Sequence, residues 1–216
     1  MKKMFLSLAA LSMMAMSCGD GKDVESTDAQ EVIDQTTETT VEYSTVKEGS
    51  KVHWHATKLV VGEHMGYFSL SNGSAKATDG KLTNGSFTVD ISTLTNTDIE
   101  DAEKKGQLEG HLKSADFFNA EKYPTAKFEI TKVEAAEGDY NTTISGNLML
   151  KDSTRNVTFD ANVEATDEMV SIKSEKFNID RTQWGIHYGA EGTPDLVKDN
   201  VISNAVGITI DVTLTK

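Results

Sequence analysis

AVGITIDVTLTK, residues 205–216, alternates apolar and polar side chains along its whole length. The apolar members that share one face of this stretch are Val206, Ile208, Ile210, Val212 and Leu214. Successive side chains of a β-strand point to opposite faces of the sheet, so the stretch predicts a strand with one dry and one wet face. Such one-sided burial is typical of antiparallel sheets, because helices cover both faces of parallel ones.

The same alternation recurs through most of the chain. It is present in SFTVDIS (86–92), TAKFEIT (125–131), NTTISGNLML (141–150) and NVTFDANVE (156–164). Turn-forming residues at 72–73, 84–85, 137–139 and 151–154 fall between apolar runs and predict turns. About eight short strands favour a sandwich or a closed barrel. Because we expect the last strand to be paired on both sides, we predict an all-β fold, an eight-stranded antiparallel barrel with a short helical insertion.

The helical insertion is expected within TDIEDAEKKGQLEGHLKSADFF, residues 97–118, where apolar residues recur at helical spacing. Gly106 interrupts the pattern, so one broken helix or two short ones should lie across the sheet or over a barrel mouth. Pro124 holds the residue before it in extended backbone and so starts the strand 125–131. Phe117 and Phe118 are adjacent and could not both point inwards from a strand, so we expect them to plug the barrel mouth from the insertion.

The first residues have the layout of a secretory signal. Residues 1–17 combine a positively charged start, an apolar run and a small-residue region, and are too short to span a membrane. Cys18, the sole cysteine, stands where a bacterial lipoprotein signal places its acylated residue, and AMSC resembles a lipobox. This predicts a membrane-anchored lipoprotein of the cell envelope, periplasmic or associated with the outer membrane. The alternative is a plain signal peptide, cleaved nearby, that leaves a free cysteine.

Residues 18–40 are acidic and rich in threonine. Such a segment cannot bury enough apolar surface to offset its ordering entropy, so we predict a disordered, solvated tether. Residues 41–216 have the size of one domain with a full core, and they contain no internal repeat.

The formal net charge of the chain is −13, and it becomes −15 when the signal removes Lys2 and Lys3. A surface this acidic repels nucleic acid and anionic lipid head groups, and no basic patch counters it. Nucleic acid is therefore excluded as a partner.

HLKSADFFNAEKYPTAKFEI, residues 111–130, is similar to the signature of the YceI-like family of secreted lipid-binding proteins. Residues 51–68, 146–163 and 177–186 resemble further elements of the same family, so the resemblance covers about residues 43 to 215. The chain departs from the family in KDSTRN, residues 151–156, where members often have a glycine and a Thr-Lys-Pro-like run. That difference alters a hairpin tip and leaves the pocket unaffected.

The resemblance implies a lipocalin-like barrel whose apolar interior holds a long-chain isoprenoid or fatty-acid-like molecule. It implies no catalytic residues and no cofactor. The candidate ligand-binding residues are Trp54, Phe68, Phe87, Phe117, Phe118, Phe128, Phe159, Ala161, Arg181 and Trp184. Taken singly, each aromatic residue on a strand face is better explained by plain core packing, although together they could line a tunnel. The alternative is therefore a solid barrel with a structural or protein-binding role in the envelope, and a homodimer is left open.

Arg181 stands in an apolar and aromatic setting beside Trp184. It could meet a polar head group at the barrel mouth, as could His64 and His111. A structural role is favoured, in which the guanidinium stacks on the tryptophan or pairs with a carboxylate.

Two further groups of residues have the side-chain types of a metal site and of a hydrolase triad. His53 and His55 share one face of a strand and could supply half of a metal site, but the residues between and beside them form the apolar face. We therefore expect both imidazoles to face solvent and predict no metal site. His111, Ser114 and Asp116 are the residue types of a hydrolase triad, yet no Gly-x-Ser-x-Gly elbow is present. We predict that the protein is not an enzyme.

Overall fold

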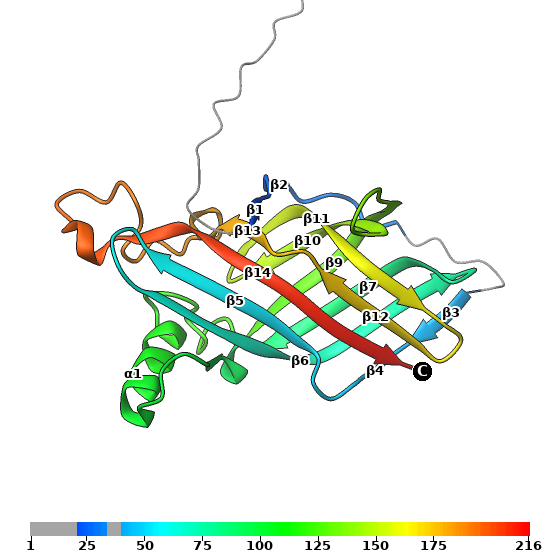
Figure 1. The fold of residues 1–216 in the computed structure, drawn as a ribbon, viewed down its shortest axis with the longest axis horizontal. Helices are drawn as coiled ribbons and strands as arrows, with labels where there is room; N and C mark the ends of the chain where they lie inside the picture. Colours follow the sequence, from blue (N-terminus) through cyan, green and yellow to red (C-terminus); the bar gives the residue numbers. More distant parts are fainter. Residues whose placement is uncertain (1–20, 34–39) are drawn as a thin grey trace, which may run out of the picture.

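The computed structural model describes residues 21–33 and 40–216, so the predicted signal peptide and Cys18 lie outside the described residues. Eight long strands build the body of the molecule (Figure 1). They are β5 (Lys51–Lys58), β6 (Glu63–Thr78), β7 (Lys81–Asp90), β9 (Thr125–Ala135), β10 (Thr142–Leu150), β11 (Ser153–Ala165), β12 (Met169–Ser174) and β14 (Ile202–Thr215). The short strands are β1 (Lys22–Asp23), β2 (Thr27–Asp28), β3 (Thr40–Tyr43), β4 (Thr45–Val46), β8 (Thr95–Asn96) and β13 (Phe177–Asp180). The helices are α1 (Ala102–Lys113) and the 3₁₀-helices η1 (Ile91–Thr93), η2 (Arg181–Trp184) and η3 (Lys198–Asn200).

The eight long strands close into an antiparallel barrel. Each strand pairs with the next in the order β5, β6, β7, β9, β10, β11, β12 and β14. The C-terminal strand β14 closes the ring, because Ile208 lies opposite Trp54 of β5 while Val212 lies opposite Ile172 of β12. The predicted fold class and the pairing of the last strand on both sides are confirmed.

Two of the four predicted turns are wrong. Strand β6 runs without a break through Asn72 and Gly73, and β7 runs through Asn84 and Gly85. The turn between these strands is Asp79-Gly80 instead, where both residues have positive φ (52° and 72°). The predicted turns near 138 and 151 are confirmed.

The two misassigned glycines have a packing role in their strands. A Cβ on Gly85 would lie 2.9 Å from Cε2 of Phe87, and one on Gly73 would lie 3.1 Å from Cδ2 of Leu214. Glycine in a strand often marks such a close approach, and here large inner side chains pack directly over the backbone.

Helix α1 is continuous through Gly106, so the predicted break is wrong. Its N-terminus is capped by Asp101, whose carboxylate accepts a hydrogen bond from the backbone N–H of Lys104 at 2.9 Å. A single glycine costs a helix about 1 kcal/mol relative to alanine, which a capped helix tolerates. Figure 1 shows α1 projecting at one end of the barrel, and none of its residues is buried.

Replacing Gly106 by Ala should raise the free energy of unfolding by about 0.5–1 kcal/mol. A Cβ at this position meets no atom within 4 Å, so the substitution gains helix propensity without a clash. Urea unfolding measures the change, with Gly85→Ala as a control that should destabilise because of its contact with Phe87. An unchanged or lower stability of Gly106→Ala would contradict the account of α1.

Residues 21–33 differ from the predicted tether, because they lie against the barrel. Strand β1 pairs in parallel with β13, and β2 pairs with β11. Farther along, the backbone N–H of Gln30 donates to Oδ1 of Asn147 at 2.9 Å, while Nδ2 of Asn147 donates to the carbonyl of Gln30 at 2.7 Å. Hydrogen bonds to a strand edge and to a side-chain amide thus hold a polar segment that buries little apolar surface.

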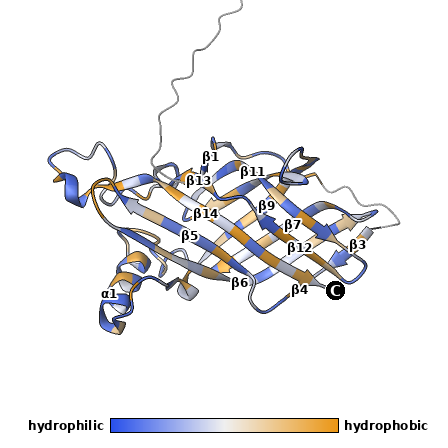
Figure 2. Ribbon diagram, viewed as in Figure 1, coloured by the Kyte–Doolittle hydropathy of each residue, from blue (hydrophilic) through white to orange (hydrophobic). Residues whose placement is uncertain are grey.

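The apolar side chains gather inside the barrel in two clusters. Figure 2 shows the alternation of hydrophobic and hydrophilic residues along the strands. The larger cluster includes the parallel rings of Phe159 and Phe177, whose centroids are 4.6 Å apart. The smaller one, around Trp54, Phe68 and Ile91, has side chains of the α1 segment packed against it.

Candidate ligand-binding site

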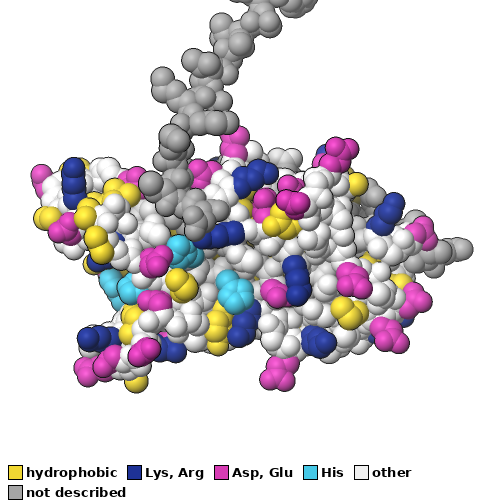
Figure 3. Space-filling view, in the orientation of Figure 1, with side chains coloured by type: hydrophobic (Ala, Val, Ile, Leu, Met, Phe, Trp, Pro, Cys, Tyr) yellow, Lys and Arg dark blue, Asp and Glu magenta, His cyan; other side chains and the backbone are white. Residues whose placement is uncertain are grey.

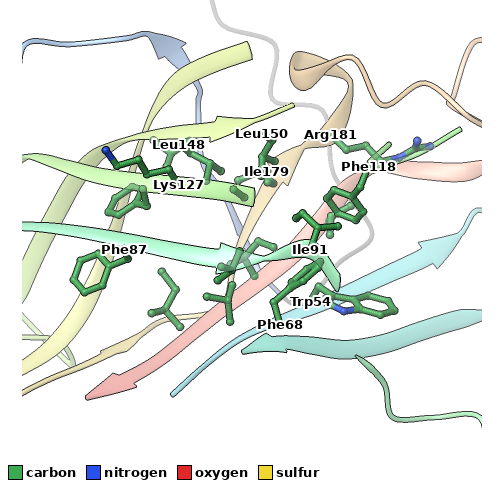
Figure 4. A pocket seen from close by; sticks show the side chains of 18 of the residues that line it. Trp54, Phe68, Phe87, Ile91, Phe118, Lys127, Leu148, Leu150, Ile179 and Arg181 are labelled. Carbon is green, nitrogen blue, oxygen red and sulfur yellow. The ribbon is translucent and has the colours of Figure 1, made fainter. Parts of the chain in front are cut away.

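The barrel is hollow. Its interior holds a cavity of about 200 Å³, whereas one water needs roughly 10–15 Å³. The wall is formed by inward-facing aliphatic and aromatic side chains (Figure 4). Among the residues that the structure describes, Lys127 and Arg181 are the only charged ones that line it. An apolar space of this size is shaped for an apolar molecule rather than for water.

Eight of the ten candidate ligand-binding residues line this cavity. They are Trp54, Phe68, Phe87, Phe117, Phe118, Phe128, Phe159 and Arg181. The other two do not line it. Ala161 is fully buried in the larger core cluster, and Trp184 is fully buried with its indole N–H donating to the carbonyl of Leu148 at 2.9 Å.

Many aliphatic residues complete the wall and were not among the candidates. Ile144, Leu148, Ile172 and Val212, for example, lie on inner strand faces that the alternation already marks. Ile91, the last apolar residue in the alternation of residues 86–92, also lines the cavity, but it does so from the 3₁₀-helix η1 rather than from a strand.

The segment around α1 covers one end of the cavity. Leu112 of the helix and both Phe117 and Phe118 line the cavity there. The ring of Phe118 lies edge-on to Phe68 of β6, with centroids 5.5 Å apart. The adjacent phenylalanines are thus brought to the mouth by the insertion, as the sequence predicts.

Arg181 is 4 % exposed at this mouth and donates hydrogen bonds to four backbone carbonyls. The acceptors are Ile186 (2.9 Å), Tyr188 (2.9 Å), Ile202 (3.1 Å) and Ser203 (3.0 Å). These bonds use four of the five N–H donors of a guanidinium and tie the segment after η2 to the start of β14. The contacts favour the structural role that the sequence indicates for this residue.

The surroundings of Arg181 also change its acidity. Burial lowers the pKa of the guanidinium, while Asp180 and Glu191 oppose that shift. Arginine remains charged throughout the ordinary pH range, so its contacts do not depend on pH.

His111 braces the mouth from α1. Its Nε2 lies 3.0 Å from Oδ2 of Asp116, and its ring is edge-on to Phe117 and Tyr188, at 5.1 and 4.8 Å between centroids. Ser114 ends the helix, and its hydroxyl accepts a hydrogen bond from the backbone N–H of Asp116. The imidazole is thus paired with the carboxylate, and the serine with the backbone, rather than with each other as a nucleophile and its base.

His53 and His55 lie on the outer face of β5. Nε2 of His55 is 2.8 Å from Glu63, and its Nδ1 is 3.3 Å from Nζ of Lys176. The ring of His53 lies edge-on to Tyr67. Within residues 21–33 and 40–216, no group of three or more metal-binding side chains is present.

The model of the YceI-like domain matches residues 43–214. That range covers most of the chain and all eight long strands except Thr215, the last residue of β14.

The chain belongs to the YceI-like family.

Among its relatives is a UPF0312 protein of Pseudomonas putida, 34 % identical over 125 residues, which are 56 % of this chain and 60 % of that protein. The match thus spans less than two thirds of the length of this relative. Among solved structures, BcnA of Burkholderia cenocepacia has a TM-score of 0.59 at 20 % identity, with 76 % of this chain and 95 % of BcnA covered. A polyisoprenoid-binding domain from Saccharophagus degradans has a TM-score of 0.57 at 14 % identity, with 80 % and 98 % covered. These two likenesses show the shared fold.

A buried asparagine fixes the insertion of this YceI-like barrel to its wall. Asn96 of β8 is 0 % exposed, and its Nδ2 donates to the carbonyl of Met65 and to Asp98. Its Oδ1 accepts from the backbone N–H of Ile99, while its own backbone N–H donates to Glu109 of α1 at 2.8 Å. The sequence reasoning missed this residue, because a lone asparagine between threonines carries no local sign of burial.

Asp98 is part of the same network. Burial tends to raise its pKa, but hydrogen bonds from Met65, His64 and Asn96 outweigh that effect and hold the pKa below its usual value. The ionised carboxylate of Asp98 therefore stabilises the folded state at pH values above the ordinary aspartate pKa. This stabilisation is lost as the pH falls through the lowered pKa of Asp98 in the folded protein.

Replacing Asn96 by Ala should lower the free energy of unfolding by about 2–3 kcal/mol, since the substitution removes three hydrogen bonds of a buried side chain, each worth about 0.5–1.5 kcal/mol. Thermal or urea unfolding measures the loss. The control is Asn162→Ala on the exposed face of β11, which should change stability by less than about 0.5 kcal/mol. Equal effects of the two substitutions would show that Asn96 does not fix the insertion.

Proposed function

We propose that this YceI-like barrel binds a long-chain apolar lipid, of the isoprenoid or fatty-acid type, at the bacterial cell envelope. The observation that carries the proposal is the hollow interior of about 200 Å³, lined almost throughout by aliphatic and aromatic side chains. Each methylene that such a wall removes from water contributes about 0.8 kcal/mol, so a long chain can bind without specific polar contacts.

The ligand class is supported by a structural neighbour. The Saccharophagus degradans domain with the same fold is a polyisoprenoid-binding domain. The binding proposal also fits the polar residues near the mouth, because Arg181 bonds the protein's own backbone carbonyls and His111 is paired with the carboxylate of Asp116. We therefore propose a binding role rather than a catalytic one.

Lipid that accompanies the protein through purification tests this proposal. Solvent extraction of the purified protein, followed by mass spectrometry, should release one class of long-chain lipid in near-equal molar amount to the protein. Protein unfolded and washed before extraction is the control for adsorbed host lipid. Lipid recovery no higher than in that control, together with no uptake of added fatty acid or isoprenol, would contradict the proposal.

The envelope location rests on the predicted lipid anchor at Cys18. Within the described residues, no helix has the length and apolar character needed to cross a bilayer. Only residues 19 and 20 would separate an acylated Cys18 from Gly21, where the described segment begins, and the three peptide units between these two residues reach at most roughly 11 Å. Because residues 21–33 lie on the barrel, such an anchor would hold it close to the membrane.

Replacing Cys18 by Ala should move the protein from the membrane fraction to the soluble fraction of lysed cells. One acyl chain binds membranes only marginally, so stable anchoring takes at least two chains. The substitution removes the cysteine that would carry them. Fractionation followed by immunoblotting measures the shift. A variant that stays with the membranes in the parent's proportion would show that the anchor lies elsewhere.

A further inference from the structure

Large apolar side chains are exposed mainly at the α1 end of the barrel. The exposed large hydrophobic residues of the described chain are Val32, Ile33, Leu59, Val60, Val61, Met65, Tyr188 and Val197. Five of these eight belong to the β5–β6 turn and to the segment between η2 and β14. The turn is the most exposed, since Val61 at its tip is 82 % accessible.

These five residues, Leu59, Val60, Val61, Tyr188 and Val197, form what we call the apolar collar. Its two segments are joined, because the backbone N–H of Leu59 donates to the carbonyl of Val201 at 3.0 Å. Figures 2 and 3 show hydrophobic residues in this region, at the end of the barrel that carries α1.

The collar continues into the cavity wall. Ala56 lines the cavity three residues before Leu59, and Ile186 lines it two residues before Tyr188. The ring of Tyr188 also lies 5.1 Å from that of Phe117, which lines the mouth. Apolar side chains therefore extend from the solvent-facing tip of the collar to the interior.

This continuity between the collar and the cavity wall favours a lipid surface as the partner that covers the collar. A lipid chain that leaves a bilayer through water must expose its methylenes to the water. If the collar is inserted in the bilayer, the methylenes stay in apolar surroundings during the whole transfer. The two segments that carry the collar contain two lysines and four acidic residues, namely Lys58, Lys198, Glu63, Glu191, Asp195 and Asp199. This acidic excess and the net charge of −13 both oppose anionic head groups.

We propose that the apolar collar inserts into an uncharged, zwitterionic lipid surface, where the apolar chain passes between bilayer and cavity. This inference rests on the proposed function for the nature of the cargo. The short reach from an acylated Cys18 to Gly21 would bring the barrel to the same surface.

Flotation with phosphatidylcholine vesicles tests the collar directly. All proteins are full chains that carry Cys18→Ala, so that no acyl group at this position contributes. The test variant is Val60→Asn with Val61→Asn, and the matched control is Val32→Asn with Ile33→Asn, which removes two exposed apolar side chains away from the collar. The collar variant should bind vesicles at least about tenfold more weakly, and the control should bind like the parent. Phosphatidylglycerol vesicles should bind the parent more weakly at low salt.

Transfer of a fluorescent fatty acid, parinaric acid, from vesicles to protein gives the second readout. The collar variant should take up the probe at least about tenfold more slowly from vesicles, with an affinity in solution within about twofold of the parent. A parent that floats no better than its collar variant would overturn the proposal. So would a parent dimer that the collar substitutions convert to a monomer, because the face would then join two copies of the chain. Flotation needs no ligand, so a parent that floats but never binds parinaric acid contradicts the proposed function and not the collar.

Discussion

Replacing Arg181 by Met should lower the free energy of unfolding by at least about 3 kcal/mol. Methionine keeps much of the side-chain volume but removes donors to four backbone carbonyls, and each buried group left without a partner costs about 1–3 kcal/mol. Urea unfolding measures the loss. Arg181→Lys should also destabilise strongly, since a single ammonium cannot reproduce the planar fork that bridges two segments.

The chain supplies its own control for this substitution. Arg155, the other arginine, pairs at 3.2 Å with Asp28, whose side chain is 97 % exposed. Exposed ion pairs contribute little, so Arg155→Met should change stability by less than about 0.5 kcal/mol. If Arg181→Met were equally mild, the guanidinium would not be what joins the segment after η2 to β14.

Replacing Val89 by Phe should weaken the binding of long-chain fatty acids about 50-fold. Val89 lines the cavity from β7, and the larger ring would fill the room of roughly three methylenes, at about 0.8 kcal/mol each. Chains too short to reach this position should bind as they do to the parent. Tryptophan fluorescence with fatty acids of graded length measures the effect.

Ala161→Phe is the control that separates the cavity from the solid part of the core. Ala161 is fully buried and does not line the cavity, so the ring would overpack the core and cost roughly 1–3 kcal/mol of stability. Thermal melts of both variants are compared. A Val89→Phe protein that loses stability yet binds every chain like the parent would contradict the hollow-barrel account.

The strands and their closure could be predicted because the alternation of apolar and polar residues shows, within each segment, which face of the strand is buried. Turns were less certain, since Asn-Gly pairs at 72–73 and 84–85 suit both a tight turn and a strand crossed by a large side chain. Only the position of Phe87 over Gly85 decides between them. In the same way, the continuity of α1 depends on its cap at Asp101, which outweighs the local cost of Gly106.

The alternation predicted those residues of the candidate site that lie on the inner faces of strands. Trp54 and Phe159 line the cavity, whereas Ala161 shares that alternation but lies where the core is filled. Contacts between segments far apart in the chain could not be predicted. The bonds of Asn96 to Met65 are one example.

The docking of residues 21–33 on the barrel also escaped the sequence reasoning. Composition correctly shows that the segment buries little apolar surface. It cannot show that Asn147, more than a hundred residues away, presents an amide that matches the backbone at Gln30.

The most direct test of the hollow barrel is its affinity for unbranched fatty acids of increasing chain length, measured by calorimetry on the purified, delipidated protein. The account predicts one chain per barrel, with an affinity that rises about fourfold per methylene until the cavity is full and then stays constant. Absence of binding at every length, or an affinity that does not depend on chain length, would contradict it.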